Sequence, residues 1–512
     1  MNPLTSPGVS VRQPVAATPS AHPAHRAFEG GLPALLIVAL AGGTLGFFLW
    51  QSWSAPHLGS ALGEIAFIGL PLLGAAFSLA LWLEYARYFS ARAGVTFAKS
   101  LRHDAITWAP FLLLWATYIL PPNLATGSRL LVLGAILFAI LKVLIAARFN
   151  QTVREVLLDF VATRVAIIVI AELAAVIIGQ RPGQHVSESS QLLLAVWGRW
   201  DAVHYLNIAT RGYQGTEMAF FPLYPMMIRA LGILVGNHLV AGLLISNACF
   251  FFALLFLYKL LEREFDRTVA RRAIFYVSIF PSAVFFSAVY TESLFFMLTV
   301  ATFFYLRRRR WLLAGTIGFF AAMTRVEGIL LLVPFALEWY AVYRNRLLEN
   351  IRSLLPAALI GAGLALYMAY LWVVTGDPLF FSHVQAHWNR HLAPPWVSVT
   401  NSILAIAHAH SGAAVANQAL ELSFTALMVA VLIFGWKRLR PSYIAYMALS
   451  VLIPMSTSSL MSMPRFALVL FPLFAILARW GDRPWVNNLI LAFSLPLLGL
   501  FTVLFADWYW VA

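Results

Sequence analysis

One acidic side chain stands among aromatic residues at the end of a long apolar stretch. Asp201 occurs in W-G-R-W-D-A-V-H-Y (197–205), directly after Trp200 and shortly before His204 and Tyr205. Acidic residues at a membrane boundary are costly and tend to mark function. The flanking side chains can stack on a sugar ring and form hydrogen bonds. We therefore expect the chemistry of this chain at Asp201, against the alternatives that it caps a helix or pairs with Arg199.

Four more charged residues occur in otherwise apolar surroundings. Glu292, in Y-T-E-S, could position a substrate or form a second acidic site, or it could cap the helix expected at 293–306. Arg325 and Glu327 share one short turn, where Arg325 could bind a phosphate bidentately or pair with a nearby acid. Arg465 has no acidic residue near it in sequence, which favours a lipid phosphate as its partner over simple snorkelling.

A polar cluster follows Gly376. Trp388 could pack on a sugar face, with Gln385 and Arg390 donating hydrogen bonds. Three histidines recur every four residues, a spacing that would place them on one helix face, and only Asp377 is near them as a carboxylate. Metal sites usually need such a further ligand, so a polar helix face is favoured over a metal site for His383, His387 and His391.

The chain that carries these residues is built for a membrane. Of its 512 residues 61% are hydrophobic and 11% are charged, whereas a soluble domain has roughly 25% charged residues. A spanning helix needs about 20 apolar residues. About fifteen runs approach this length, at about 32–50, 62–89, 106–119, 130–147, 160–179, 238–260, 273–290, 292–306, 311–324, 326–343, 354–375, 421–436, 442–458, 465–479 and 487–507. The sequence predicts an all-α polytopic membrane protein.

The basic loops give these spans a direction. Arg and Lys cluster in alternate connections, as at 259–272, 307–310 and 437–440, and such loops face the cytoplasm. The N-terminus then lies inside and the acidic residues of interest lie outside. Polar residues from separate parts of the chain thus converge on the extracytoplasmic face, as in a site built from loops on a rigid scaffold. Two long loops there span about 180–237 and 376–420.

We expect the chain to divide into three segments. Residues 1–31 are rich in Pro, Ala, Ser and His and are expected to form a disordered cytoplasmic tail. Residues 32–150 hold about four spans without a polar constellation and are expected to be an accessory block. Residues 151–512 form the expected catalytic core, with about eleven spans. No cleaved signal peptide is expected.

Composition also excludes several classes of protein. The single cysteine, Cys249, rules out an internal disulfide and a thiolate metal cluster. The formal net charge of +14 is explained by membrane topology and contact with anionic lipid, so no nucleic acid partner is expected. Metal-binding motifs such as D-x-D are absent near Asp201, and we expect no metal and no other cofactor.

Five segments, taken in order, resemble the family of the second mannosyltransferase of GPI-anchor assembly and its bacterial relatives, which are glycosyltransferases of the C fold class (GT-C). The resemblance covers about residues 160–480, whereas the four leading spans depart from the family pattern. The segments are R-W-D-A-V-H-Y-L-N-I-A-T-R-G-Y (199–213) with A-F-F-P-L-Y-P (219–225), F-F-S-A-V-Y-T-E-S-L-F-F (285–296), T-R-V-E-G (324–328), G-D-P-L-F-F-S-H-V-Q-A-H-W-N-R (376–390) and S-M-P-R-F-A-L-V-L-F-P-L-F (462–474).

The resemblance implies a GT-C-type helical bundle that moves a sugar, with mannose favoured, from a polyprenyl-phosphate carrier to an acceptor hydroxyl. It implies inversion at the anomeric carbon, with Asp201 as the general base and Glu292 as a second acidic residue of the site. Arg325 and Arg465 are expected at the donor phosphate. The expected substrate-binding residues are Trp200, His204, Tyr205, Glu327, Gln385, Trp388 and Arg390.

The sequence leaves the acceptor open among a glycolipid, a glycan and a protein. The Ala-, Leu- and Arg-rich composition suits a bacterial cytoplasmic membrane, with the site facing outward. A lipid or glycolipid transporter is the alternative from another class, although transporters place polar sites near the midplane of repeated helices. A non-catalytic scaffold subunit of the same fold is the third hypothesis, and the presence of Asp201 speaks against it.

Overall fold

The computed structural model describes residues 150–178 and 192–511, with scattered positions between 86 and 148. The chain divides into two compact units, Met1–Gly43 with Ser52–His103 and Thr44–Gln51 with Asp104–Ala512. All helices named below belong to the second unit. The expected tail at 1–31 and most of the accessory block at 32–150 lie outside the described residues, so the predicted domain boundaries stay predictions.

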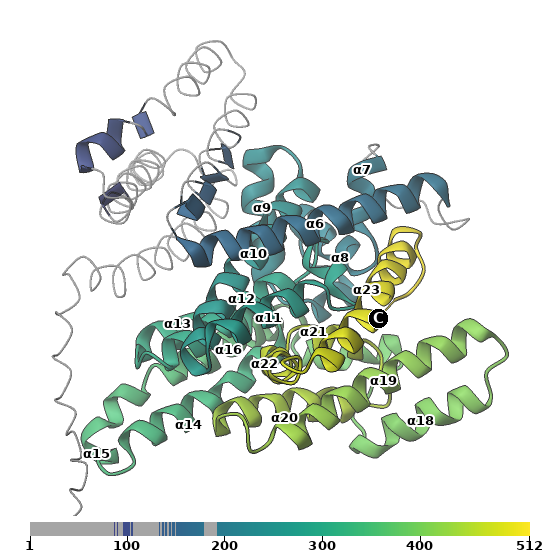
Figure 1. The fold of residues 1–512 in the computed structure, drawn as a ribbon. Coiled ribbons are helices and arrows are strands. Elements are labelled where there is room, and N and C mark those ends of the chain that lie inside the picture. The colour runs from purple at the N-terminus through teal and green to yellow at the C-terminus, as the bar shows by residue number, and fades with distance from the viewer. Residues whose placement is uncertain are drawn as a thin grey trace, which may run out of the picture. The chain divides into compact units, whose positions relative to one another are not determined.

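The described part of the chain consists of helices joined by turns and loops, with one isolated bridge between Leu392 and Thr457. Its main helices are α6 (Gln151–Ile177), α7 (Leu192–Ala195), α8 (Asp201–Arg211), α9 (Leu223–Val235), α10 (His238–Glu264), α11 (Arg267–Ser278), α12 (Glu292–Leu306), α13 (Trp311–Thr324), α14 (Leu332–Tyr343), α15 (Leu347–Asn350), α16 (Ala357–Thr375), α17 (Phe380–His383), α18 (Pro395–Ala407), α19 (Gly412–Gly435), α20 (Pro441–Met455), α21 (Met463–Leu468), α22 (Phe471–Trp480) and α23 (Pro484–Ala506) (Figure 1).

Six described segments are long and apolar enough to cross a membrane: 151–177, 238–264, 326–343, 347–375, 412–435 and 484–506. Shorter apolar helices, including α12, α13, α20 and α22, lie between them. These segments confirm an all-α integral membrane protein.

Two expected spans are broken by proline. The run at 273–290 is helical only to Ser278 in α11, because Pro281 follows and a short 3-10 turn at Ala283–Phe286 replaces the helix. The run at 465–479 is divided into α21 and α22, with Pro472 in the first turn of α22. The first break puts irregular backbone directly before Glu292, and the second follows α21, which carries Arg465.

Two short helices separate acidic from basic residues. α12 begins at Glu292 and ends before Arg307, and α13 begins at Trp311 and ends before Arg325. α12 packs between α10 and α13, and α13 packs on α16 (Figure 1). The helix connection therefore places Glu292 and Arg325 at one end of the bundle, and the four arginines at 307–310 at the other.

Glycine allows a close contact between α13 and α16. A Cβ atom at Gly363 of α16 would lie 2.3 Å from the backbone oxygen of Phe319 in α13. Small residues are typical where membrane helices approach closely. The position of α13, and with it of Arg325 at its end, thus depends on a glycine contact.

The basic end is closed by an ion-pair network whose carboxylates are buried. Arg307 binds Glu264 and, at 3.0 Å, Glu338. Arg440 reaches Glu264 at 2.6 Å, and the Ser442 hydroxyl donates to Glu338 at 2.5 Å. These contacts join the ends of α10, α12, α14 and α20. They fix the scaffold from the side opposite the predicted site.

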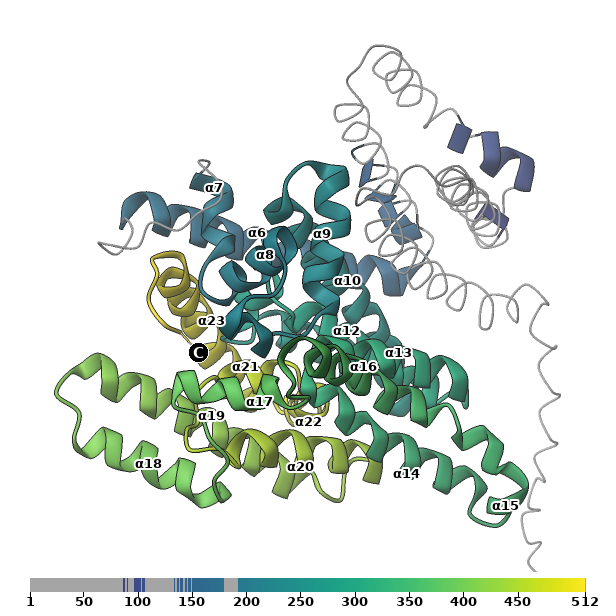
Figure 2. The same cartoon turned by 180° about the vertical axis from the view of Figure 1, so that it is seen from behind.

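The two long loops expected on the outer face are largely helical. The first contains α7, α8 and α9, and the second contains α17, a 3-10 turn at Val384–Trp388 and α18. α18 and the early part of α19 form a helical hairpin, which is visible from behind (Figure 2). α17 contacts both α16 and the Gly215–Ala219 turn of the first loop. The second loop is thereby brought against the first.

Candidate active site

Arg465, on α21, is the centre of the predicted site. Its Nη1 lies 2.7 Å from Oδ2 of Asp201, and its Nε and Nη2 both lie 2.8 Å from Oε1 of Glu292. The guanidinium also lies over the rings of Tyr290 and Phe285, 4.9 and 5.1 Å from their centroids. Arg465 is buried, so these contacts are shielded from water. Asp201 and Glu292 lie 264 and 173 residues away from Arg465 in the sequence. Neighbouring residues therefore gave no sign of these two partners.

Arg325 extends the network on the other side of Glu292. Its Nη1 lies 3.1 Å from Oε1 of Glu292, and its Nη2 lies 3.1 Å from Oε1 of Glu327. Of the two readings open for Arg325, pairing with nearby acids is the one that the structure shows. Three carboxylates and two guanidiniums leave this network with one formal negative charge.

The three carboxylates differ in their access to solvent. The Glu292 side chain is 0% exposed and the Glu327 side chain is 11% exposed, whereas the Asp201 side chain is 22% exposed. Asp201 is therefore the acid of the network that a substrate hydroxyl can reach most easily. Asp201 and Glu292 each stand at the first position of a helix, α8 and α12, where the backbone dipole favours a negative charge. Neither serves as the N-cap residue.

The turn before Asp201 is strained and held from outside. Trp200 has φ 58°, a region that a bulky side chain rarely adopts. The Tyr290 hydroxyl accepts the Asp201 N–H at 3.2 Å and donates to the Arg199 carbonyl at 3.1 Å, so it binds the backbone on both sides of Trp200. Sequence reasoning missed Tyr290. Its only signal was its place two residues before Glu292 in a motif of the resemblance.

The end of the chain packs against this turn. The Trp200 ring lies 5.7 Å from Trp508 and 5.3 Å from Trp510, centroid to centroid. Arg199 does not pair with Asp201; it lies over Trp508 and is buried near Asp507. Burial lowers the pKa of Arg199 to about 10, although the charge of Asp507 opposes this. Trp200 thus belongs to an aromatic cluster, and its expected role in sugar stacking stays a prediction.

Aromatic side chains join the two outer loops. His204 stacks on Phe220 with centroids 4.7 Å apart, and Trp388 from the second loop meets both rings edge-on at 6.4 and 6.3 Å. Trp388 therefore stands beside the helix that begins with Asp201. Tyr205 is buried behind Phe220 with its hydroxyl 3.3 Å from Thr291, and its expected substrate contact stays a prediction.

Arg390 is the cation of the site that has no carboxylate partner. Among residues 150–178 and 192–511, no acidic oxygen lies within ion-pair distance of its side chain. Burial lowers the pKa of Arg390, and the carboxylates of Glu327 and Glu421 offset this only in part. Gln385 lies at the same turn, where its backbone oxygen accepts the Arg390 N–H at 3.2 Å. Arg390 thus adds a positive charge beside a network that is formally negative.

The expected histidine face is interrupted. α17 ends at His383, a 3-10 turn follows, and Asn389 has φ 54°, so the three histidines do not share one α-helix. His383 Nδ1 lies 2.6 Å from Asp377 Oδ2, and this hydrogen bond lowers the pKa of Asp377. Within the described ranges no three or more His, Cys, Asp or Glu side chains gather as metal ligands would. Independence from metals stays a prediction.

Three buried polar atoms of the site have no hydrogen-bond partner among the residues that the structure describes. They are Trp200 Nε1, His204 Nδ1 and Glu292 Oε2. Buried polar groups are almost always hydrogen-bonded, so each exception calls for an explanation. All three belong to residues of the predicted site, which supports a functional role for this part of the chain.

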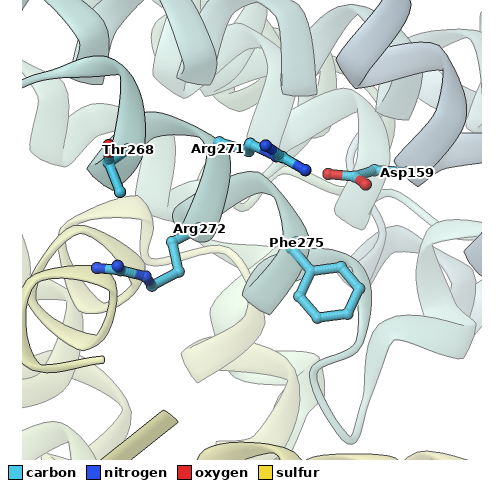
Figure 3. Close-up of a pocket in the computed structure, with 5 residues that line it drawn as sticks. All are labelled: Asp159, Thr268, Arg271, Arg272 and Phe275. Atoms are coloured by element: carbon cyan, nitrogen blue, oxygen red, sulfur yellow. The ribbon is translucent and has the colours of Figure 1, made fainter. Parts of the chain in front are cut away.

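A separate cavity of about 390 Å³ lies between α6 and α11 and is lined by none of the predicted site residues. The Arg271 guanidinium points toward the Asp159 carboxylate (Figure 3). Arg272 extends toward the C-terminal helices, donating to the Ala478 carbonyl at 2.9 Å and contacting Asp482 at 3.2 Å (Figure 3). Arg272 is thus already paired within the protein, and we do not assign this cavity to the active site.

Known proteins confirm the resemblance seen in the motifs. Residues 129–364 match the family model described as Mannosyltransferase (PIG-V). The chain is 27% identical over 217 residues to GPI mannosyltransferase 2 of Yarrowia lipolytica, covering 39% of this chain and 59% of that protein. It is 32% identical over 169 residues to GPI alpha-1,6-mannosyltransferase 2 of Rattus norvegicus, covering 29% of this chain and 32% of that protein. The chain thus matches less than two thirds of either relative. The family match includes Asp201, Glu292 and Arg325 but ends before Arg390 and Arg465.

Proposed function

We propose that this chain, a relative of the PIG-V mannosyltransferases, is a membrane-embedded glycosyltransferase that transfers mannose from a polyprenyl-phosphate carrier to an acceptor hydroxyl. The acceptor oxygen bonds to the anomeric carbon as the bond from that carbon to the phosphate oxygen breaks. Polyprenyl phosphate leaves with the bonding electrons, and the hydroxyl proton passes to Asp201. One displacement of this kind inverts the anomeric configuration.

One observation carries the proposal: Asp201 is the most exposed carboxylate of a buried ion-pair network. Its single side-chain partner in that network is Arg465, which contacts Oδ2 and leaves Oδ1 without a contact from the network. Oδ1 can therefore accept the proton of a hydroxyl. A positioned base of this kind contributes roughly 10²–10⁴-fold to a rate. Trp200, His204 and Trp388 form the aromatic surroundings in which a sugar would be held.

The remaining polar residues fall into supporting roles. Glu292 orients Arg465 and Arg325, and we assign contacts with donor or acceptor to Glu327 and Gln385. Arg390 is the strongest candidate to contact the donor phosphate, while Arg325 and Arg465 contribute positive charge and stay paired with their carboxylates. Cleavage of the phosphodiester leaves a phosphomonoester with one more negative charge, and a guanidinium stabilises such developing charge.

The test is transfer of radiolabelled mannose from polyprenyl-phosphate-mannose by membranes that carry the wild type or Asp201→Asn. We expect Asp201→Asn to lose about 10²–10⁴-fold in rate while remaining folded. Asp482→Asn is the control, because Asp482 is 80% exposed and lies at the basic end. Unchanged transfer by a folded Asp201→Asn protein would refute Asp201 as the base. Absence of transfer by the wild type would refute polyprenyl-phosphate-mannose as the donor.

We further propose that the site faces outward from a bacterial cytoplasmic membrane, since the basic loops lie at the other end. The one cysteine, Cys249, is buried, so labelling by a thiol reagent will come from a cysteine introduced by substitution. Ser382→Cys at the site end and Glu349→Cys at the basic end are both exposed positions. In intact cells a membrane-impermeant maleimide should label the first and spare the second. The reverse pattern would overturn the orientation.

A further inference from the structure

A buried carboxylate of α19 holds the backbone that leads to Arg465. Oε1 of Glu421 accepts the Ser462 N–H at 2.9 Å, and Oε2 accepts the Met463 N–H at 2.8 Å. Glu421 is 6% exposed, so both hydrogen bonds are formed away from water. Hydrogen bonds to a charged group are the stronger ones. Both carboxylate oxygens are therefore used to fix one short stretch of backbone, 41 and 42 residues further along the chain.

That stretch has an unfavourable conformation. Ser462 has φ 75°, in the left-handed region that a residue other than glycine adopts only at a cost. Such residues persist when the surrounding structure holds them in place. The two hydrogen bonds from Glu421 do this, and α21 starts directly afterwards with Arg465 as its third residue.

We propose that Glu421 is a positioning residue, which sets Arg465 on Asp201 and Glu292 by holding Ser462 in its left-handed conformation. The inference rests on the proposed function for its catalytic consequence, but the hydrogen bonds themselves are independent of it. Glu421 has no contact with Asp201, and its effect on the base passes through the backbone of α21. Loss of the two hydrogen bonds would allow Ser462 to relax and would withdraw the guanidinium from both acids.

Two substitutions separate this role from a general structural one. Glu421→Gln keeps the shape but turns an amide donor toward one of the two N–H groups, which loses one hydrogen bond. We expect the transfer rate to fall about tenfold or more, as the loss of a charge-assisted hydrogen bond implies. Ser462→Gly removes the conformational cost at that position. In the Glu421→Gln background it should restore most of the lost rate, whereas Ser462→Ala should restore none.

Glu338→Gln is the matched control, because Glu338 is also buried and also accepts two hydrogen bonds, from Arg307 and Ser442, at the basic end. Transfer rates are compared at equal amounts of monodisperse protein. Failure of Ser462→Gly to rescue Glu421→Gln, or an equal loss in the control, would overturn the inference.

A second measurement does not depend on activity. Hydrogen exchange at the Ser462 and Met463 amides should speed up in Glu421→Gln and stay unchanged in Glu338→Gln. If the wild type transfers no mannose, the proposed function fails, and exchange alone decides whether Glu421 holds this segment. If the wild type transfers mannose and exchange at both amides is unaltered in Glu421→Gln, the proposed function stands and the positioning role is overturned.

Discussion

Replacement of Arg465 by methionine should destabilise the protein strongly. Met retains an unbranched apolar stem but removes the charge that contacts two acids, Asp201 at 2.7 Å and Glu292 at 2.8 Å. Asp201 can be hydrated in the variant, because its side chain is 22% exposed. Glu292 cannot, since it is 0% exposed and would keep only Arg325, at 3.1 Å. Removal of one partner from a buried pair costs about 3–5 kcal/mol, and we expect Arg465→Met to fall in this range.

The measurement is unfolding of purified protein in mixed micelles as the fraction of denaturing detergent is raised. Arg346→Met is the control, because Arg346 is 74% exposed and its contact to Glu349 is 3.9 Å long; its cost should stay below about 1 kcal/mol. Glu292→Gln should relieve the unpaired charge, so the double variant should recover roughly 0.5–3 kcal/mol relative to additive losses. Two results would refute a network that is shielded from water and in which the residues depend on one another. One is a loss of unfolding free energy for Arg465→Met as small as that for Arg346→Met. The other is strict additivity of the two losses in the double variant.

Three further predictions follow from other contacts. Tyr290→Phe removes the hydroxyl that binds both sides of the strained turn, so transfer should fall roughly tenfold; an unchanged rate would show that the turn holds without it. Arg390→Ala should raise the KM for the lipid-linked donor roughly tenfold or more, with Arg390→Lys in between, and an unaltered KM would remove Arg390 from the donor site. Gly363→Ala places Cβ 2.3 Å from the Phe319 oxygen and should lower the free energy of unfolding by about 1–3 kcal/mol. Gly361→Ala is the control and should be nearly neutral, because nothing lies within 4 Å of its Cβ. Equal effects of the two substitutions would contradict the close packing of α13 and α16.

Hydropathy predicted most of the helices in the described core because a spanning helix needs a long apolar run, whatever its neighbours are. Hydropathy gave the wrong helix bounds where a helix ends inside an apolar run or begins before it. Pro281 ends the expected span at 273–290 early, whereas α19 begins at Gly412, nine residues before the expected start at 421, with Ser411 as its N-cap. The polar residues Asn417 and Gln418 hid this extension, since they lower hydropathy without breaking a helix.

The grouping of the candidate site residues could be predicted from the sequence, whereas the contacts among them could not. Alternating spans assign each loop to a face, which sufficed to group Asp201, Glu292, Arg325 and Arg465 from distant parts of the chain. Which cation meets which acid depends on how α8, α12 and α21 pack, and the sequence carries no local signal for that. Glu421 escaped notice for the same reason, because its partners are backbone N–H groups that every sequence possesses.

The packing also bears on which arginine can receive a phosphate. A donor phosphate that took Arg465 from Glu292 would leave a fully buried carboxylate without one of its two cations, and separation of a buried pair costs about 3–5 kcal/mol. The same holds for Arg325, whose partners are Glu292 and Glu327. Arg390 has no such partner to give up within the described ranges. Binding there adds a counter-charge to an arginine that lacks one, while Arg465 remains in place to orient the base. The same network can therefore hold Asp201 and admit an anionic donor only if the two tasks fall to different arginines.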